Sequence, residues 1–249
     1  MTTRSQSVPL SPLPSRPSAV DLCEAALRTA ILDGVFAIGT RLPPERDLAD
    51  RLGVNRVTVR SALQRLEVVR LVTVRQGSGY TVHDYPRHGG PDLLVALAER
   101  AEREGTLADF ARDILCTRRH LARMVLEALA ETVDERGRGE IGDAVARFAD
   151  AVASKDPERI AVADIGVSHA LVEGTRSPVL RLMLNPVIAV APRIPTLRDA
   201  MYRKPKENLA GWQLLLAWLD RPTKRGIEAL GEVLEARDQA TVTLLRSHA

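Results

Sequence analysis

The sequence has few of the residues on which metal-binding, disulfide-bonded and membrane-spanning proteins depend. Its 249 residues include 2 cysteines and 5 histidines, and aromatic residues make up only 3%. Cys23 and Cys116 lie far apart in helical patterns, which indicates small buried side chains in a reducing cytoplasm. No apolar run approaches the roughly 20 residues of a membrane span, and the polar N-terminus lacks the apolar core of a signal peptide. We therefore expect a soluble, cytoplasmic protein that contacts no membrane.

The composition favours a folded chain whose positive charge is confined to one surface. Hydrophobic residues make up 45% of the sequence, which is enough to fill the cores of two domains. The net charge is only +3, so any affinity for nucleic acid must come from a local patch. Nearly all the basic residues are arginines, which suit bidentate contacts to phosphate and guanine, although a GC-rich genome would produce the same bias.

The N-terminal third predicts a winged helix-turn-helix. Residues 1–17 contain four prolines and little to bury, so we expect a disordered tail. The domain that follows covers residues 18–84, in which three helical patterns precede a β-hairpin. The helical patterns span residues 19–32, 45–52 and 55–69, and the two strands span 71–75 and 80–83, around the turn Gly77-Ser78-Gly79.

The rest of the chain predicts a helical bundle. Residues 85–92 hold two prolines and a glycine pair, which indicates a linker. From residue 93 to residue 249 every patterned stretch is helical. We expect helices at residues 93–103, 107–133, 138–154, 156–174, 178–190, 206–220 and 223–246. The predicted fold class is therefore mainly α, with an N-terminal winged helix-turn-helix whose wing has two strands and a C-terminal all-α bundle.

Six arginines and a single acidic residue lie between Arg51 and Arg75. Arg56 and Arg60 are four residues apart and share one helix face, with Thr58 near the same end. This is the end at which a recognition helix presents side chains to base edges. The alternative is a solvated, ion-paired helix face, but acidic partners are scarce in this stretch. The pattern predicts binding to double-stranded DNA.

The same stretch resembles a known family. The segment DGVFAIGTRLPPERDLADRLGVNRVTVRSALQRLEVVRLVTVRQGSGYTV is similar over nearly its whole length to the DNA-binding domain of GntR-type regulators. The resemblance implies that the side chains contacting operator DNA come from the second helix, the recognition helix and the wing. They are Arg46, Asn55, Arg56, Thr58, Arg60, Gln76 and Gly77.

The chemistry of these residues suits such contacts. Arg56 and Arg60 can form bidentate contacts to guanine or phosphate, and Asn55 and Thr58 can reach phosphate oxygens. Arg46 has an alternative partner in Asp50, four residues on. The sequence departs from the family at Arg70, where the family usually has a glycine that ends the recognition helix; we expect Arg70 to cost stability or to alter the entry to the wing.

The helical region resembles the effector domain of the FadR subfamily. The resemblance lies mainly in the segments ARDILCTRRHLARMVLEALA and VADIGVSHALVEGTRSPVLRLMLN. Arg118 and Asp164 each fall inside an apolar helical stripe, and a buried charge requires a partner. Either the two form a structural ion pair or cap another group, or Arg118 holds the acidic head of an effector.

The metal site of many FadR-type sensors is not expected here. In those sensors an aspartate, a histidine one turn later and two further histidines bind a divalent metal. Here Ser168 follows Asp164 by four residues and His169 by five, while Trp212 and Leu234 stand near the other ligand positions. The loss resembles the fatty acyl-CoA-responsive members, which makes His169 a third candidate effector contact; a buried core histidine is the alternative.

These observations predict a ligand-responsive transcription regulator. By resemblance it is a homodimeric repressor of a palindromic operator, located on the nucleoid in the cytoplasm, with no cofactor. The expected effector is acidic, with fatty acyl-CoA placed ahead of a small hydroxy, keto or sugar acid. A ligand-independent architectural DNA-binding protein is the remaining alternative. No Ser-His-Asp signature, phosphate-binding loop or CxxC motif indicates an enzyme.

Overall fold

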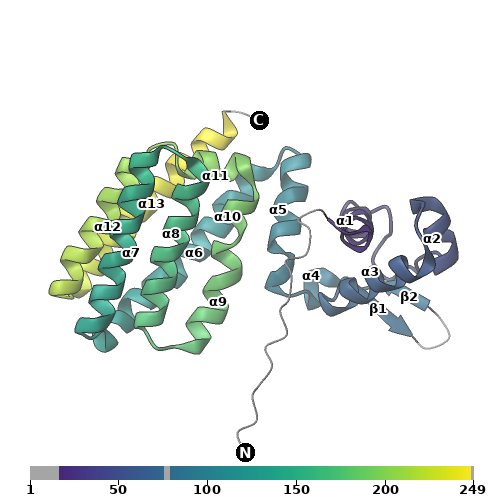
Figure 1. Cartoon of the computed structure of the whole chain (residues 1–249), viewed down its shortest axis with the longest axis horizontal. Coiled ribbons are helices and arrows are strands. Elements are labelled where there is room, and N and C mark those ends of the chain that lie inside the picture. Colours follow the sequence, from purple (N-terminus) through teal and green to yellow (C-terminus); the bar gives the residue numbers. More distant parts are fainter. Residues whose placement is uncertain (1–16, 76–78, 248–249) are drawn as a thin grey trace, which may run out of the picture. The chain divides into compact units, whose positions relative to one another are not determined.

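The chain divides into two compact units, with the boundary between Gly89 and Gly90. The structure is a computed structural model that describes residues 17–75 and 79–247 (Figure 1). All but the last residue of the expected tail, 1–17, lies outside the described residues. The expected linker, 85–92, contains the short helix α4 (Tyr85–His88) and the start of a 3-10 turn, η1 (Pro91–Leu93).

The first unit is a winged helix-turn-helix. Its helices are α1 (Ala19–Leu32), α2 (Glu45–Leu52) and α3 (Arg56–Val68), and its wing pairs β1 (Val72–Arg75) with antiparallel β2 (Gly79–Val82). Local sequence sets the helix ends. Ser18 and Asp21 form a capping box at the start of α1, and Gly53 ends α2 in the left-handed conformation.

The core of this unit lies between the helices and the wing. The fully buried side chains come from α1, α3 and the start of the wing: Ile31, Leu32, Val59, Leu63, Leu66 and Leu71. Their spacing on α3 leaves the opposite face of that helix in solvent. The core therefore decides which face of α3 is available to DNA.

Arg70 connects α3 to β1 in a left-handed conformation. Its φ is 60°, a region that favours glycine because a Cβ atom crowds the following carbonyl. The backbone at position 70 thus has the left-handed conformation that glycine, the usual residue of the family there, adopts without strain. The Arg70 side chain is exposed and its Nη1 donates to the His88 carbonyl at 3.4 Å, a long contact.

The second unit is all α-helical, as predicted. Its helices are α5 (Leu94–Arg103), α6 (Leu107–Thr132), α7 (Glu135–Ser154), α8 (Pro157–Gly174), α9 (Pro178–Ile188), α10 (Val190–Arg193), α11 (Pro195–Met201), α12 (Pro205–Asp220) and α13 (Lys224–Arg246). Asp134, Asp156, Ser177 and Thr223 accept backbone N–H groups at the starts of four of them. The helices α10 and α11 were not predicted; both are short, with Pro192 inside α10 and Pro195 at the start of α11.

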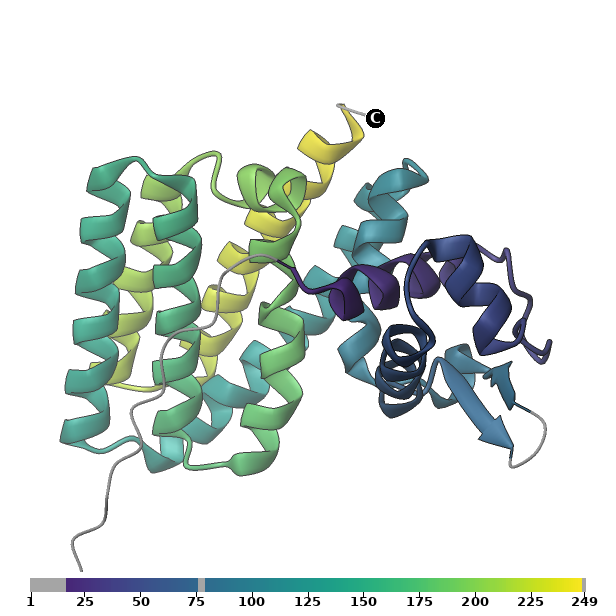
Figure 2. The same cartoon turned by 45° about the vertical axis from the view of Figure 1, so that its right-hand side comes forward.

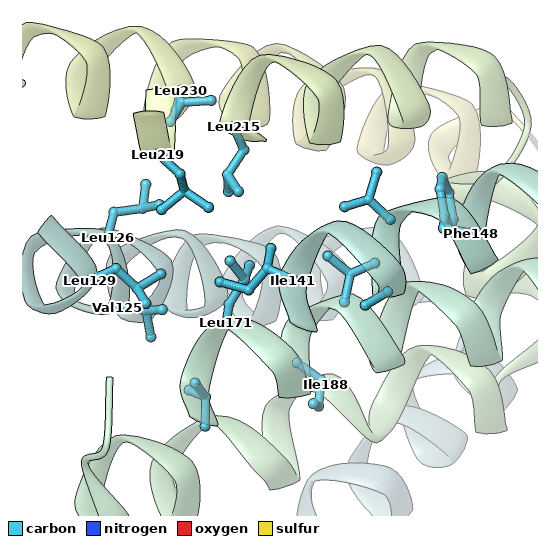
Figure 3. Close-up of a cluster of buried hydrophobic side chains, with 14 of the residues drawn as sticks. Val125, Leu126, Leu129, Ile141, Phe148, Leu171, Ile188, Leu215, Leu219 and Leu230 are labelled. Carbon is cyan, nitrogen blue, oxygen red and sulfur yellow. The ribbon is translucent and has the colours of Figure 1, made fainter. Parts of the chain in front are cut away.

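The long helices of this unit pack around one apolar centre. Figures 1 and 2 both show α7 and α8 side by side along most of their length. Leu129, Ile141, Phe148 and Leu219 are at most 1% exposed in this centre (Figure 3). Each such side chain stabilises the fold by about 1.5–3 kcal/mol through burial. Among the described residues, none of the helices combines the length and the apolar character that crossing a membrane requires.

Candidate functional site

The start of α3 is shaped by Asn55 and Thr58. Asn55 Oδ1 accepts hydrogen bonds from the Thr58 backbone N–H at 2.8 Å and from Thr58 Oγ1 at 3.0 Å. Thr58 is 8% exposed, whereas Asn55 is exposed. The Thr58 hydroxyl therefore completes the helix cap, and its hydrogen is committed inside the domain. The Asn55 side-chain amide keeps its two N–H donors for a ligand.

Arg60 projects from α3 into a bidentate pair with Glu45 at the start of α2. Arg60 Nε lies 3.1 Å from Glu45 Oε1, and Arg60 Nη2 lies 2.8 Å from Glu45 Oε2. These hydrogen bonds raise the pKa of Arg60 further above its usual value. The pair occupies one edge of the guanidinium, and a planar guanidinium has a second edge, Nη1–Nη2, that suits guanine. Glu45 therefore orients Arg60.

The other arginines of this surface differ in their partners. Within the described part of the chain, neither Arg51 nor Arg56 is paired with a carboxylate, and both are exposed. Arg46 lies 3.5 Å from Asp47 and not against Asp50, and its side chain is 67% exposed. The alternative of an ion-paired helix face thus applies to Arg60 but not to Arg56.

Fewer of the candidate DNA-contacting residues can be described in the wing. The predicted contacts Gln76 and Gly77 lie outside the described residues. Arg41, which the sequence analysis did not single out, forms an isolated bridge with Thr81 of β2. Its guanidinium Nε and Nη2 lie 3.5 Å from the place where a Cβ on Gly79 would stand. This exposed arginine therefore lies against the base of the wing, on the same domain as Arg46 and Arg56.

A cavity of about 100 Å³ lies inside the second unit. Its polar lining comes chiefly from Arg118, Asp164, Trp212 and Arg237. The other lining residues are mostly aliphatic and come from α6, α8, α9, α12 and α13. Among them are Leu184 and six side chains labelled in the apolar centre of Figure 3, namely Val125, Leu126, Leu171, Ile188, Leu215 and Leu230. The cavity is thus a hollow in the core with a few charged groups.

Asp164 is held by two neutral donors. Tyr202 Oη donates to Asp164 Oδ2 at 2.9 Å, and Trp212 Nε1 donates to Asp164 Oδ1 at 2.8 Å. Burial raises the pKa of Tyr202 well above its usual value, and the Asp164 carboxylate raises it further. Tyr202 therefore stays protonated and remains a donor. Asp164 itself is 7% exposed, which confirms the burial that its apolar stripe indicated.

Arg118 pairs with Asp238 and not with Asp164. Arg118 Nη2 lies 2.6 Å from Asp238 Oδ1, and Arg119 Nη1 lies 3.0 Å from Asp238 Oδ2. Burial raises the pKa of Asp238, while Arg118 and Arg119 act in the opposite direction. The Arg118–Asp164 ion pair considered from the sequence is therefore wrong, because each residue has partners on other helices. Arg118 Nε is buried without a hydrogen-bond partner in the described structure.

Arg237 is a second cavity arginine, and the sequence analysis missed it. Its Nε is also buried with no acceptor among the described residues. Burial lowers the pKa of Arg237, an effect opposed by Asp164 nearby. In the sequence, Arg237 lies in a helix rich in charged residues and resembles any solvated position. The one available signal was its neighbour in sequence, Asp238, because both residues face the interior of the unit from α13.

His169 does not contribute to the cavity. Its side chain is exposed, and it is not among the lining residues. Five residues along an ideal helix rotate a side chain by about 140°, so His169 points away when Asp164 points inward. The alternative of a buried core histidine is therefore wrong, and His169 as an effector contact stays a prediction that this cavity does not support.

The residues around Asp164 do not fit the divalent metal of related sensors. Both Asp164 oxygens accept hydrogen bonds from Tyr202 and Trp212, and an indole N–H cannot bind a cation. The described residues contain no group of three or more histidine, cysteine, aspartate or glutamate side chains able to hold a metal ion. The cavity therefore presents arginine donors where a metal would otherwise bind an acid.

Comparisons with known families match both units. Residues 22–82 match the family of bacterial regulatory proteins named gntR, and residues 113–236 match the FCD domain. The chain is 34% identical over 172 residues to the HTH-type transcriptional regulator Rv0494 of Mycobacterium tuberculosis, covering 68% of this chain and 67% of that protein.

Two further relatives match over shorter stretches. The HTH-type transcriptional regulator Mce2R of Mycobacterium tuberculosis is 50% identical over 74 residues, which cover 30% of this chain and 31% of that protein. The fatty acid metabolism regulator protein of Haemophilus influenzae is 38% identical over 80 residues, 32% of this chain and 33% of its own length. The matches thus span about a third of each of these two proteins.

A solved structure from Listeria monocytogenes, described as Lar, which controls expression of the agr system, shares the fold. Its TM-score is 0.63 at 13% identity, over 94% of this chain and 99% of that one. This likeness concerns the fold, while the family matches place a gntR-type domain before an FCD domain in one chain. The chain belongs to the GntR family of bacterial regulatory proteins, in the FadR-type branch with an FCD domain, and is a DNA-binding transcription regulator rather than an enzyme.

Proposed function

We propose that the protein is a homodimeric repressor of a palindromic operator, released by an acidic ligand that binds in the cavity. The observation that carries the ligand response is the pair of buried Nε groups on Arg118 and Arg237, neither of which has an acceptor. A buried donor without a partner costs about 1–3 kcal/mol, and an anion in the cavity would remove that cost at both arginines.

The best candidate for the ligand is a fatty acyl-CoA. The aliphatic lining suits an acyl chain, and the arginines suit a thioester or phosphate head. A groove of about 300 Å³ between α6 and α13 shares Ala122, Leu126, Leu230 and Leu234 with the cavity, so only aliphatic side chains separate the groove from the cavity. A relative named as a fatty acid metabolism regulator protein adds support.

A small hydroxy, keto or sugar acid is the second candidate. The observation that favours it is the cavity volume of about 100 Å³, since pockets for larger ligands are typically about 300–1,000 Å³. A long acyl chain would have to part the side chains between the cavity and the groove, whereas a small acid would not. An architectural protein without a ligand would have no use for a hollow core.

On the DNA side, we propose that Arg56 and Arg60 contact bases or phosphates and that Arg46 and Asn55 contact phosphates. Thr58 would act by fixing the helix start, and Gln76 and Gly77 would enter the minor groove. Each protomer would read one half-site, which a palindromic operator requires. Binding to the chromosome would then place the protein on the nucleoid in the cytoplasm.

The test is a fluorescence anisotropy titration of the full chain at fixed salt. An operator is first selected from random duplexes, and the complex is then titrated with a long-chain acyl-CoA, with free CoA and with a hydroxy acid. Release by acyl-CoA alone supports the lipid ligand, and release by the hydroxy acid alone supports the second candidate. Binding that ignores every acid would contradict the ligand response.

Arg237→Met tests the site with the ion pairs left in place. Arg237 takes part in no ion pair with a described residue, so its loss should leave operator affinity unchanged and weaken the ligand response about tenfold or more. Arg225→Met is the matched control, because Arg225 is an exposed arginine on the same helix. Equal responses of the two variants would contradict the cavity as the ligand site.

Sedimentation of the operator complex should show two protomers per duplex.

A further inference from the structure

Val57 is an exposed apolar side chain in the first turn of α3. It is 71% exposed, while Val59, two residues on, is fully buried. Its neighbours in sequence are Arg56, which is exposed, and Thr58, whose hydroxyl donates to the capping residue Asn55. A single exposed valine is unremarkable on most surfaces. Here it stands in the first turn of the recognition helix, next to Arg56 and three residues before Arg60.

Helix geometry places Val57 at the middle of the DNA-facing side. At about 100° per residue, Val57 lies about 170° from the mean direction of the buried residues Val59, Ala62, Leu63 and Leu66. Arg60 lies about 60° from Val57 around the same helix, and Arg56 about 100°. Val57 is therefore the residue of the first turn that points most directly away from the core, with both arginines on one side of it.

We propose that Val57 packs against the 5-methyl group of a thymine in the major groove, and that each operator half-site carries a thymine beside the base pair nearest Arg56 and Arg60. Thymine is the base that presents a methyl group in the major groove, and apolar side chains recognise it. Val57 has no hydrogen-bonding group in its side chain, so the methyl group is the one feature of a base edge that it can select. The proposal requires DNA binding only and is independent of the ligand response.

The charges around Val57 favour DNA over a protein partner. Arg51 and Arg56 have no carboxylate partner in the residues that the structure describes. Arg60 keeps the Nη1–Nη2 edge of its guanidinium available for a ligand. The free backbone N–H groups at the start of α3 add to the positive potential. Such a surface attracts phosphate, and the phosphate contacts would bring Val57 to the base edges. Val68, which is 81% exposed, ends the same helix and lacks this setting.

The test removes the methyl group from the DNA and the valine side chain from the protein. With the selected operator, each thymine is replaced in turn by deoxyuridine, which lacks only the 5-methyl group. For the natural protein we expect one position in each half-site at which this replacement weakens binding about fourfold, the factor expected for burying one methyl group. Val57→Ala should bind the thymine operator correspondingly less well and should not distinguish thymine from deoxyuridine at that position.

Two further variants keep the result interpretable. Val68→Ala, the control on the same helix, should retain the full response to deoxyuridine. Val57→Thr keeps a methyl group on Cβ and should retain part of the response to deoxyuridine. Thermal melting tests whether each variant is folded. The proposal is overturned if Val57→Ala still distinguishes thymine from deoxyuridine, or if no thymine of either half-site is sensitive to loss of its methyl group.

Discussion

The arginines of α3 have different partners, although the sequence presents them as one basic run. Arg56 is exposed and unpaired within the described residues, Arg60 is bound to Glu45, and Arg65 lies 2.6 Å from Asp21 of α1. The hydrogen bond from Arg65 lowers the pKa of Asp21 to about 2, with Ser18 adding to the effect. Arg65 thus joins two helices of the domain, which leaves Arg56 and Arg60 as the arginines of α3 that we propose contact DNA.

Glu45→Gln should reduce the selectivity of DNA binding. The variant loses the carboxylate that orients Arg60, so the guanidinium samples more directions and a bidentate base contact becomes weaker. We expect operator affinity to fall about fivefold, at the lower end of the discrimination supplied by one bidentate pair. Affinity for random duplex should stay the same or rise, because a negative charge has been removed.

Asp47→Asn is the control for Glu45→Gln. Both changes remove one carboxylate from the first turn of α2, but Asp47 contacts Arg46 only at 3.5 Å. Anisotropy titrations of both variants with operator and random DNA at one salt concentration make the comparison. A loss of selectivity of equal size in both variants would mean that charge, and not the orientation of Arg60, is responsible.

At the scale of the element, the connection from α3 to β1 depends on one residue with left-handed backbone. The Leu71 backbone N–H donates to the Leu66 carbonyl, which closes the helix end, and Leu71 is fully buried immediately after the turn. The chain must therefore reverse direction within Arg70 for Leu71 to reach the core. This geometry explains why the family's glycine suits the position and why arginine there is strained.

Arg70→Gly should stabilise the first domain by about 1 kcal/mol. Glycine adopts a φ of 60° without the steric cost that a Cβ atom carries, and this gain exceeds the entropy that glycine adds to the unfolded chain. Urea unfolding of the full chain, followed on the transition of the first domain, measures the change. Arg70→Ala keeps the Cβ atom and should show no gain, so a glycine variant no more stable than the alanine variant would contradict the argument.

At the scale of the whole molecule, the proposed function requires coupling between ligand binding and DNA binding. Arg118 and Arg119 of α6 share Asp238 of α13, so these two helices are held together at the edge of the cavity. An acid that bonds to the free Nε of Arg118 would act on the same guanidinium whose Nη2 is bonded to Asp238. The ligand would thus act on the contact between the two longest packed helices of the FCD domain.

The coupling must be reciprocal. If the acidic ligand weakens operator binding by a given factor, operator DNA must weaken ligand binding by the same factor, typically 5- to 150-fold. Calorimetric titration of the ligand into free protein, and into protein saturated with operator, measures it. Random DNA of equal length should have a smaller effect. Unchanged ligand affinity on the operator, together with ligand-induced release, would show that release has another cause.

Local patterns were sufficient for most of the secondary structure. The helices α8, α12 and α13 begin and end within one residue of the expected positions, because their caps and prolines lie beside their apolar stripes. The same stripes correctly indicated that Asp164 is buried and that Arg118 faces the interior. The segments α10 and α11 were missed because elements of four and seven residues, with Pro192 inside the first and Pro195 at the start of the second, carry too little periodicity.

The partners of the charged residues depend on the tertiary structure. Arg118 meets Asp238 across 120 positions of the chain, Trp212 meets Asp164 across 48, and Arg60 meets Glu45 across 15. No local spacing encodes such pairs, so the sequence left an Arg118–Asp164 ion pair and an effector contact at Arg118 as open alternatives, and it did not indicate the roles of Arg237 and Glu45. Periodicity in the sequence indicates which side of a helix is apolar. Which side chain of a neighbouring helix contacts that side is decided only when the helices pack.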